Sequence, residues 1–251
     1  MMETRYDKWY SPSLGRDMEI KVYGHAGKPV LYIPCQNGRF FDFENFGMCE
    51  HLSHFIEGGE ISVFSIDTID AETWSNKGDD PYWRIRRHES WVRYLTDEVV
   101  PFIHAVCRER GWQEDPGILV FGASLGATHA VNLYFRFPFL FDSLLALSGI
   151  YDISYGFDGY RDSVVYDNSP MDYLPNLDPG HFYMEQYRQN RAVICTGQGA
   201  WEIPDSARAL QSICDRKGIP VWFDYWGYDV NHDWPWWYIQ AAYFLPKILY
   251  D

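Results

Sequence analysis

The G-x-S-x-G motif at 122–126 places Ser124 between two glycines. An apolar run at 117–121 precedes the motif and a helical pattern begins at Leu125, which is the strand-turn-helix setting that the motif requires. The sharp turn strains the serine backbone, and the glycines let the strand and the helix approach closely. The hydroxyl is then exposed at a helix N-terminus, where the amide of Leu125 can stabilise an oxyanion. We therefore predict Ser124 as a nucleophile and Leu125 as an oxyanion donor.

A serine hydroxyl is a weak nucleophile near neutral pH, so a histidine must remove its proton. Where this motif occurs, the chain order is serine, acid, histidine. Beyond Ser124 and its helix lie His181 and His232. His232 follows the last predicted strand, whereas His181 lies in an irregular segment with no strand before it. We predict His232 as the base; the alternative is a histidine packed among neighbouring tryptophans. His129 is predicted to be structural.

The acid that orients the histidine should follow the strand predicted at 192–196, and both Glu202 and Asp205 do. Either carboxylate could accept the histidine Nδ1 proton and stabilise the imidazolium. Asp205 follows a proline and could instead be the N-cap of a helix that starts near Ser206. Glu202 has no such alternative use, so we favour it over Asp205. Asp229 and Asp233 are weaker candidates.

A second oxyanion donor is expected in the loop 34–40, which follows an early predicted strand. Gln36 or Asn37 would supply its backbone amide, and Gly38 gives the turn its conformational freedom. Cys35 in the same loop has no histidine at a recognisable spacing, so we assign it no chemistry.

Seven apolar or β-branched runs predict the strands that position these residues. They span 19–23, 29–33, 61–66, 117–121, 143–147, 192–195 and 221–225. Helical patterns occur at 89–109, 125–135, 206–217 and 236–249. This alternation predicts an α/β protein with a mostly parallel central sheet and helices on both faces. The first two strands could instead form an antiparallel pair at one edge.

One stretch, 151–190, interrupts the alternation and is rich in Asp, Tyr, Pro and Gly. Loops this long are usually functional or disordered, and the aromatic residues favour an ordered, lid-like excursion over the site. Residues 1–251 contain no linker or repeat, so we expect a single domain.

Composition excludes several classes of protein. The net charge of −14 would repel a phosphate backbone, so nucleic acid is not an expected partner. The five cysteines have no disulfide-framework or zinc-ligand spacing, which indicates reduced thiols and no metal site. No apolar run has the length of a signal peptide or membrane span. We expect a cytoplasmic protein that does not bind membranes; a homo-oligomer is compatible with this sequence.

The sequence resembles the esterase D and antigen 85 group of serine esterases and acyltransferases. The resemblance lies in the motif at 122–126, the helix through Asn132, Phe137-Pro138, Phe141 and the run 146–149, and it continues at 197–202 and 229–234. The amino-terminal half matches chiefly at loop 34–40. Two differences are the absence of glycine at Gln36-Asn37 and a glutamate in place of the esterase D aspartate.

The resemblance implies an α/β-hydrolase fold, carboxylic-ester hydrolysis through an acyl-enzyme, and no cofactor. Ser124, Glu202 and His232 fall on the triad positions of the group. Leu125 and Gln36 fall on its oxyanion positions.

Aromatic residues follow the predicted strand ends, where open α/β sheets bind their ligands. They are Trp74, Trp83, Tyr151, Tyr155, Trp201, Trp234 and Trp236. With Asn37, the residues Trp201 and Trp234 are predicted to bind a small acyl, sugar or aryl ester. Asp67, Asp70 and Glu72 could bind polar substrate groups, but a solvated loop is the favoured interpretation. Acyl transfer by the same triad, or a catalytically silent binding protein, are the alternative functions.

Overall fold

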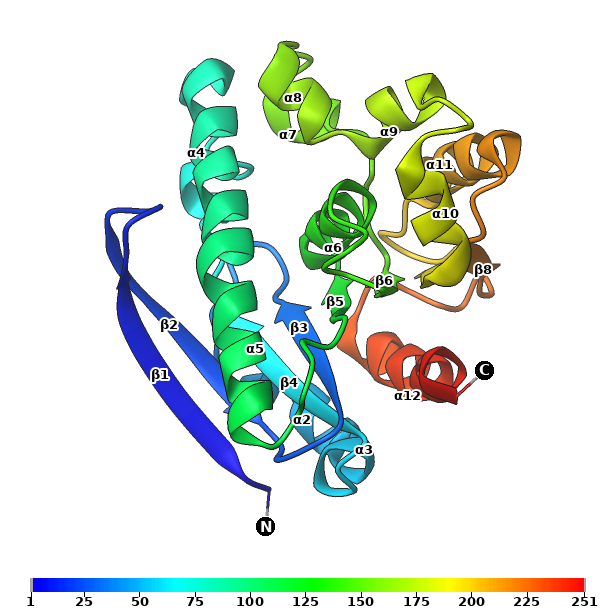
Figure 1. Ribbon diagram of the computed structural model, residues 1–251. Helices are drawn as coiled ribbons and strands as arrows, with labels where there is room; N and C mark the ends of the chain where they lie inside the picture. Colours follow the sequence, from blue (N-terminus) through cyan, green and yellow to red (C-terminus); the bar gives the residue numbers. More distant parts are fainter. Residues whose placement is uncertain (1, 251) are drawn as a thin grey trace.

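The computed structural model describes residues 2–250. One eight-stranded sheet runs through the molecule in the order β1-β2-β4-β3-β5-β6-β7-β8 (Figure 1). The strands are β1 (Thr4–Ser11), β2 (Arg16–Tyr23), β3 (Lys28–Ile33), β4 (Ile61–Ile66), β5 (Leu119–Ala123), β6 (Ser143–Leu147), β7 (Arg191–Thr196) and β8 (Trp222–Tyr225). From β4 to β8 all neighbours are parallel, whereas β2 is antiparallel to both β1 and β4. The prediction of a mostly parallel sheet is confirmed.

The amino-terminal strands differ from the prediction in two ways. Strand β1 was not predicted, because it alternates exposed and half-buried residues at the sheet edge and has no apolar run. The alternative of an antiparallel edge pair at 19–23 and 29–33 is wrong: β3 lies between β4 and β5 and is parallel to both. Residues 29–33 of β3 are all buried, as expected for a strand covered on both faces.

The helices are α1 (Asp42–Asn45), α2 (Met48–His51), α3 (Ser53–Glu57), α4 (Pro81–Tyr94), α5 (Val100–Glu109), α6 (Leu125–Arg136), α7 (Ser154–Phe157), α8 (Ser163–Asp167), α9 (Pro170–Tyr173), α10 (Phe182–Gln189), α11 (Pro204–Lys217) and α12 (Trp234–Tyr250). A π-helical turn at Leu95–Val99 joins α4 to α5, and 3₁₀ turns occur at Asp70–Glu72 and Leu174–Asn176. The helix predicted at 89–109 begins earlier, at Pro81. Asp80 is its N-cap and accepts a hydrogen bond from the Tyr82 amide, and a proline is favoured at the first helical position.

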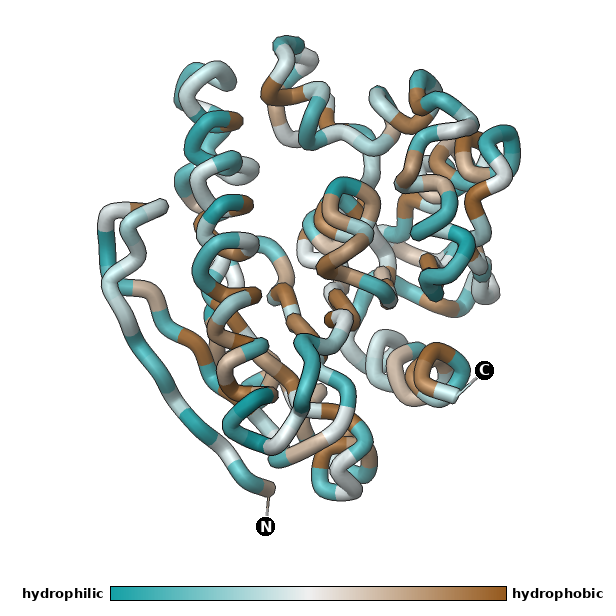
Figure 2. Tube along the Cα trace, viewed as in Figure 1, coloured by the Kyte–Doolittle hydropathy of each residue, from teal (hydrophilic) through white to brown (hydrophobic). Residues whose placement is uncertain are grey.

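Helices cover both faces of the sheet, as predicted. Alternate residues of β5 enter separate cores: Val120 packs with residues of α5, α6 and α11, whereas Leu119 and Phe121 pack with residues of α1–α3 and α12. Figure 2 shows hydrophobic residues gathered along the central strands and a largely hydrophilic β1. Two-sided burial explains why the central strands are apolar without alternation.

The segment 151–190 is ordered and consists of the short helices α7–α10 (Figure 1). Helix α8 packs against α4, and α9 packs against α6 and α11. Most of the segment therefore extends the helical layer, and only its beginning reaches the site described below. No helix formed by residues 2–250 has both the length and the apolar character needed to cross a membrane.

Candidate active site

Ser124 occupies a strained turn between β5 and α6. Its φ of 56° and ψ of −127° lie outside the regions that L-residues ordinarily adopt. A Cβ on Gly122 would lie 2.3 Å from the carbonyl of Gly126, and a Cβ on Gly126 would lie 2.3 Å from the carbonyl oxygen of Ile33. Both glycines are therefore required by close backbone approaches, and the serine is held at the carboxyl edge of the sheet.

His232 lies against Ser124, although 108 positions separate them in the sequence. Its Nε2 is 2.9 Å from Ser124 Oγ, and its backbone amide donates to the carbonyl of Ala200 at 3.0 Å. The ring of Trp237 on α12 meets the imidazole edge-on, with centroids 5.0 Å apart. A neutral imidazole at this distance from a hydroxyl can remove its proton as the oxygen attacks.

Glu202 lies behind His232 and its side chain is almost completely buried. Its Oε2 is 3.6 Å from His232 Nδ1, a distance that permits electrostatic stabilisation of an imidazolium but is longer than a hydrogen bond. The carboxylate accepts hydrogen bonds from Ser148 Oγ at 2.7 Å and from Thr196 Oγ1 at 2.9 Å. These two hydroxyls hold it in place.

Burial by itself raises the pKa of Glu202, but its contacts with His232, Ser148 and Thr196 outweigh burial, so the net pKa lies below the ordinary value of 4.5. A carboxylate whose pKa is lowered on folding adds stability above its unfolded pKa, and this contribution is lost as the pH falls through the folded pKa. We expect the difference in free energy of unfolding between wild type and Glu202→Gln to shrink below about pH 4.5. Urea unfolding at pH 7, 5 and 4 measures it; a constant difference would contradict the charged, stabilised carboxylate.

Three residues around Glu202 carried no role in the sequence prediction. Ser148 follows β6 with a φ of 56° and accepts a hydrogen bond from Trp237 Nε1 at 3.0 Å. It thereby links α12 to the carboxylate, while Thr196 ends β7. The position of Ser148 and Thr196 at the carboxyl ends of parallel strands was visible in the sequence, but their contact with Glu202 was not.

The other candidates for the acid and the base have different partners. The Asp205 side chain is 91% exposed and pairs with Arg208 at 2.8 Å. It is not an N-cap, because α11 already begins at Pro204. His181 caps α10 by accepting from the Tyr183 amide, and Asp233 accepts from the Trp234 amide at the start of α12.

The two residues whose backbone amides are predicted to donate to an oxyanion both lie beside Ser124. Leu125 and Gln36 line the same cleft as Ser124 and His232. Within residues 2–250, neither amide donates a hydrogen bond to another protein group. Burial raises the pKa of neighbouring Cys35 to about 12, which keeps this thiol protonated and unreactive.

The cleft at Ser124 has a volume of about 330 Å³, within the range of small-molecule sites. Trp74, Tyr155 and Trp201 form aromatic parts of its wall, and the Trp201 side chain is exposed at its mouth. A hollow of about 410 Å³ beside Lys28 and Arg191 lies at the opposite edge of the sheet, where these strands begin.

The other two predicted substrate-binding residues do not line this cleft. Asn37 faces a separate hollow behind the loop, and its backbone amide donates to Asp70 Oδ2 at 3.1 Å. Trp234 stacks on Phe46 with ring centroids 4.8 Å apart. Proximity in sequence to Gln36 and His232 did not determine which way these side chains point.

The prediction that the acidic residues after β4 form a solvated loop is also wrong. Asp67 and Asp70 are buried. Asp67 accepts from Arg39 Nε at 2.8 Å, and Asp70 accepts from the Asn37 amide and lies 2.9 Å from His129 Nε2. Glu72 is partly exposed and pairs with Arg16 and Arg87. The acidic residues therefore join separate parts of the fold.

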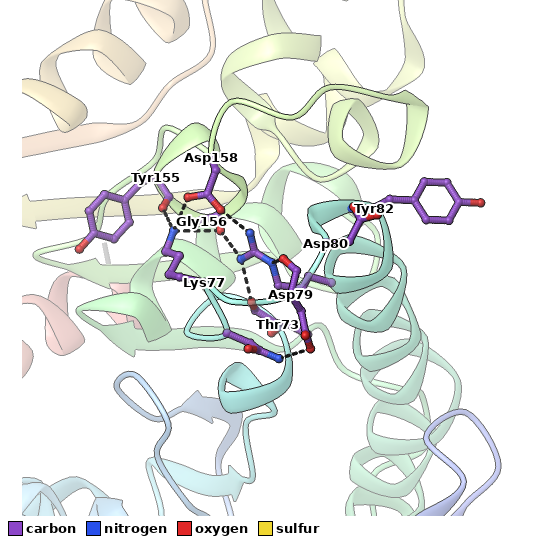
Figure 3. A network of polar contacts seen from close by, with 10 residues as sticks. Thr73, Lys77, Asp79, Asp80, Tyr82, Tyr155, Gly156 and Asp158 are labelled. Carbon is purple, nitrogen blue, oxygen red and sulfur yellow. Dashed lines mark hydrogen bonds and ion pairs between the residues drawn. The ribbon is translucent and has the colours of Figure 1, made fainter.

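Arg84 on α4 joins the two segments that form one side of the cleft. Figure 3 labels Thr73, Gly156 and Asp158, which are among its partners. Arg84 is 2% exposed and donates to the carbonyls of Thr73, Asp79 and Gly156 and to the carboxylate of Asp158. Lys77 adds hydrogen bonds to the carbonyls of Tyr155 and Gly156. The wall that carries Tyr155 is thus tied to the segment that carries Trp74.

We expect Arg84→Met to lower the free energy of unfolding by about 2–4 kcal/mol, because buried carbonyls lose their donors and Asp158 keeps only Lys77 of its two cationic partners. KM for an ester should rise as the wall loosens. Arg93→Met, an exposed arginine on the same helix, is the control and should change neither quantity. Chemical denaturation and steady-state kinetics of both variants measure these effects; equal behaviour of the two would contradict this role of Arg84.

Among residues 2–250, no group of three or more His, Cys, Asp or Glu side chains is arranged to hold a metal ion.

Comparisons with known proteins identify the family of this chain and its fold. The family model described as Putative esterase matches residues 11–242. A ferulic acid esterase structure has a TM-score of 0.74 at 18% identity and covers 99% of this chain and 97% of its own. The S-formylglutathione hydrolase of Staphylococcus aureus has a TM-score of 0.71 at 13% identity, with coverages of 99% and 97%. MPT51 of Mycobacterium tuberculosis has a TM-score of 0.71 at 17% identity and 98% coverage of both chains.

At these identities the structural matches establish the fold, which is the predicted α/β-hydrolase fold. Among curated protein sequences, none matches this chain. The family match extends over most of the sequence and includes the segments that carry Ser124, Glu202 and His232. The chain therefore belongs to the Putative esterase family, in agreement with its resemblance to esterase D and antigen 85 proteins.

Proposed function

We propose that this protein is a serine carboxylic-ester hydrolase that works through an acyl-enzyme. The observation that carries the proposal is the 2.9 Å contact between His232 Nε2 and the hydroxyl of Ser124 at a strained turn. His232 takes the proton as Ser124 Oγ attacks the ester carbonyl, and later returns it to the leaving alcohol. A water molecule, activated by the same histidine, then hydrolyses the acyl-enzyme and releases the acid.

Glu202 orients the imidazole and stabilises its positive charge in this scheme. The amides of Leu125 and Gln36 bind the negative oxygen of each tetrahedral intermediate. No cofactor takes part. The roles of Ser124, His232 and Glu202 are supported by the contacts among them, and the roles of Leu125 and Gln36 by their place in the cleft wall.

The substrate is a small ester with an acyl, sugar or aryl component. A cleft of about 330 Å³ accommodates one small molecule, and its aromatic wall suits flat rings. Trp201 is the proposed contact for such a ring, because its exposed indole borders the cleft. Asn37 and Trp234 support the site from outside, through the loop and through packing on Phe46. The names of the similar structures, ferulic acid esterase and S-formylglutathione hydrolase, agree with acyl chemistry.

A panel of esters tests this proposal. We expect the purified protein to release acid from short-chain p-nitrophenyl esters, acetylated sugars or methyl esters of aryl acids. A fluorophosphonate should form a phosphorus–oxygen bond to Ser124 with loss of fluoride, at one label per chain. Absence of both ester turnover and labelling would contradict the proposal. Formation of a new ester on addition of an alcohol would identify acyl transfer by the same residues.

A further inference from the structure

The two proposed oxyanion donors belong to different segments of the chain. The Leu125 amide begins α6, whereas the Gln36 amide lies in the oxyanion loop, which we define as residues 35–40. A pair of donors stabilises an oxyanion only if both are within about 3 Å of the place where that oxygen forms. Contacts between the loop and α6 must therefore set the distance between the donors.

We propose that Asp70 and His129 are positioning residues that fix the oxyanion loop relative to α6. Asp70 Oδ2 accepts the Asn37 amide at 3.1 Å, and Asp70 Oδ1 lies 2.9 Å from His129 Nε2. His129 is on the helix that begins directly after Ser124. One carboxylate thus binds the loop and the nucleophile helix together. This inference rests on the proposed esterase function.

The local structure of the loop shows why it needs this support. Gly38 N donates to the carbonyl of Cys35 at 2.8 Å, which closes a turn with Gln36 and Asn37 at its centre. Asn37 has a φ of 59°, in the left-handed region that glycine adopts without strain and asparagine adopts at moderate cost. The hydrogen bond from its amide to Asp70 stabilises that conformation. The adjacent peptide carries the Gln36 amide.

Asp70 and His129 are both buried, with 2% and 1% exposure, so water does not compete for their contact. A carboxylate accepts but does not donate, and the protonated Nε2 of His129 therefore donates to it. The Asp70 backbone also accepts hydrogen bonds from the Thr73 and Ser75 amides, at 3.0 and 2.8 Å. Ser75 Oγ in turn accepts from Gln36 Nε2 at 2.7 Å. Asp70 is thus connected to the loop twice, directly at the Asn37 amide and through Ser75 at the Gln36 side chain.

A purely structural ion pair would have different consequences. Replacing a buried pair by apolar side chains is often neutral for stability, whereas a displacement of about 1 Å at a catalytic group can cost a hundredfold in rate. Loss of a positioning contact should reduce kcat and the affinity for a bound oxyanion. It should have little effect on ligands that form no oxyanion.

The test compares Asp70→Ala, Asp70→Asn, His129→Phe and His129→Gln in steady-state ester hydrolysis. Asp70→Ala and His129→Phe should lower kcat by about ten- to a hundredfold and change KM little. His129→Gln places an amide donor near the position of Nε2 and should retain most of the activity. Asp70→Asn keeps an acceptor for the Asn37 amide and should be intermediate. Glu89→Gln is the matched control, because it removes a carboxylate paired with Arg136 of α6 far along the helix from the loop.

A trifluoromethyl ketone gives the second readout. Ser124 Oγ adds to its carbonyl carbon, the carbonyl electron pair becomes the oxyanion, and the proton passes to His232. Affinity for this ketone should fall in Asp70→Ala by the same factor as kcat/KM, while affinity for the neutral product alcohol stays constant. Loss of thermal stability with unchanged kcat, or an equal loss for both ligands, overturns the inference. If Asp70→Ala does not fold, equal activity of His129→Phe and His129→Gln overturns it. An inactive wild type that forms no adduct instead refutes the proposed function.

Discussion

Replacing Ser124 by alanine is expected to lower kcat for ester hydrolysis by about 10⁶-fold, as removal of the serine does in other enzymes with this mechanism. No acyl-enzyme can form without the hydroxyl, so only binding and oxyanion stabilisation of direct water attack would remain. Ser212→Ala, an exposed serine on α11, is the control and should retain full activity. Hydrolysis of a p-nitrophenyl ester measures the effect, with enough of the variant protein present to detect a rate about 10⁶-fold below that of wild type.

Ser124→Gly separates the chemistry from the backbone strain. Glycine adopts the φ of 56° seen at this position without steric cost, so the variant should be as inactive as alanine but more stable than wild type. A gain of about 1 kcal/mol in the free energy of unfolding is the expected size. Substantial turnover by either variant would show that Ser124 is not the nucleophile.

Replacing Glu202 by alanine is expected to lower kcat by about 10⁴-fold, the loss seen when the orienting carboxylate of a serine triad is removed. The carboxylate is only 1% exposed and lies 3.6 Å from His232 Nδ1, and a water molecule in its place would not supply the negative charge. The effect should be smaller than that of Ser124→Ala, because the histidine can still accept the proton in a fraction of its orientations and tautomers.

Asp205→Ala is the matched control for this prediction. Asp205 lies three positions further on, but its side chain is 91% exposed and paired with Arg208, so the variant should retain nearly all activity. Parallel kinetics of the two variants decide the identity of the acid. A large loss in Asp205→Ala alone would assign the role to Asp205 and contradict the geometry at His232.

Backbone strain in this protein is concentrated around the cleft. Non-glycine residues with positive φ in the described part of the chain are Asn37, Ser124, Ser148, Asp158 and Trp201. All but Asp158 lie in the connections that follow β3, β5, β6 and β7. Such conformations cost free energy and persist only where surrounding contacts hold them. Their clustering indicates that stability is lost at this edge of the sheet in order to position the site.

The sequence by itself determined those features that depend on neighbouring residues. Continuous apolar runs identified seven of the eight strands, because strands buried on both faces have no polar side. The helices over 125–135, 206–217 and 236–249 followed from local periodicity, and the turn at Ser124 followed from two glycines at fixed spacing. The order of elements then limited the partners of Ser124 to a few residues at later strand ends.

Only the tertiary structure decided which polar residues meet. Asp70 and Glu72 look alike in the sequence, yet one is buried against His129 and the other is partly exposed with two arginines. Ser148 became a partner of Glu202 only when β6 and β7 aligned, and β3 took its place between β4 and β5 through pairings that no local pattern encodes. A polar side chain in a loop has the same local sequence signal whether water or a distant residue satisfies it. Long-range contacts that close the fold determine which of the two occurs.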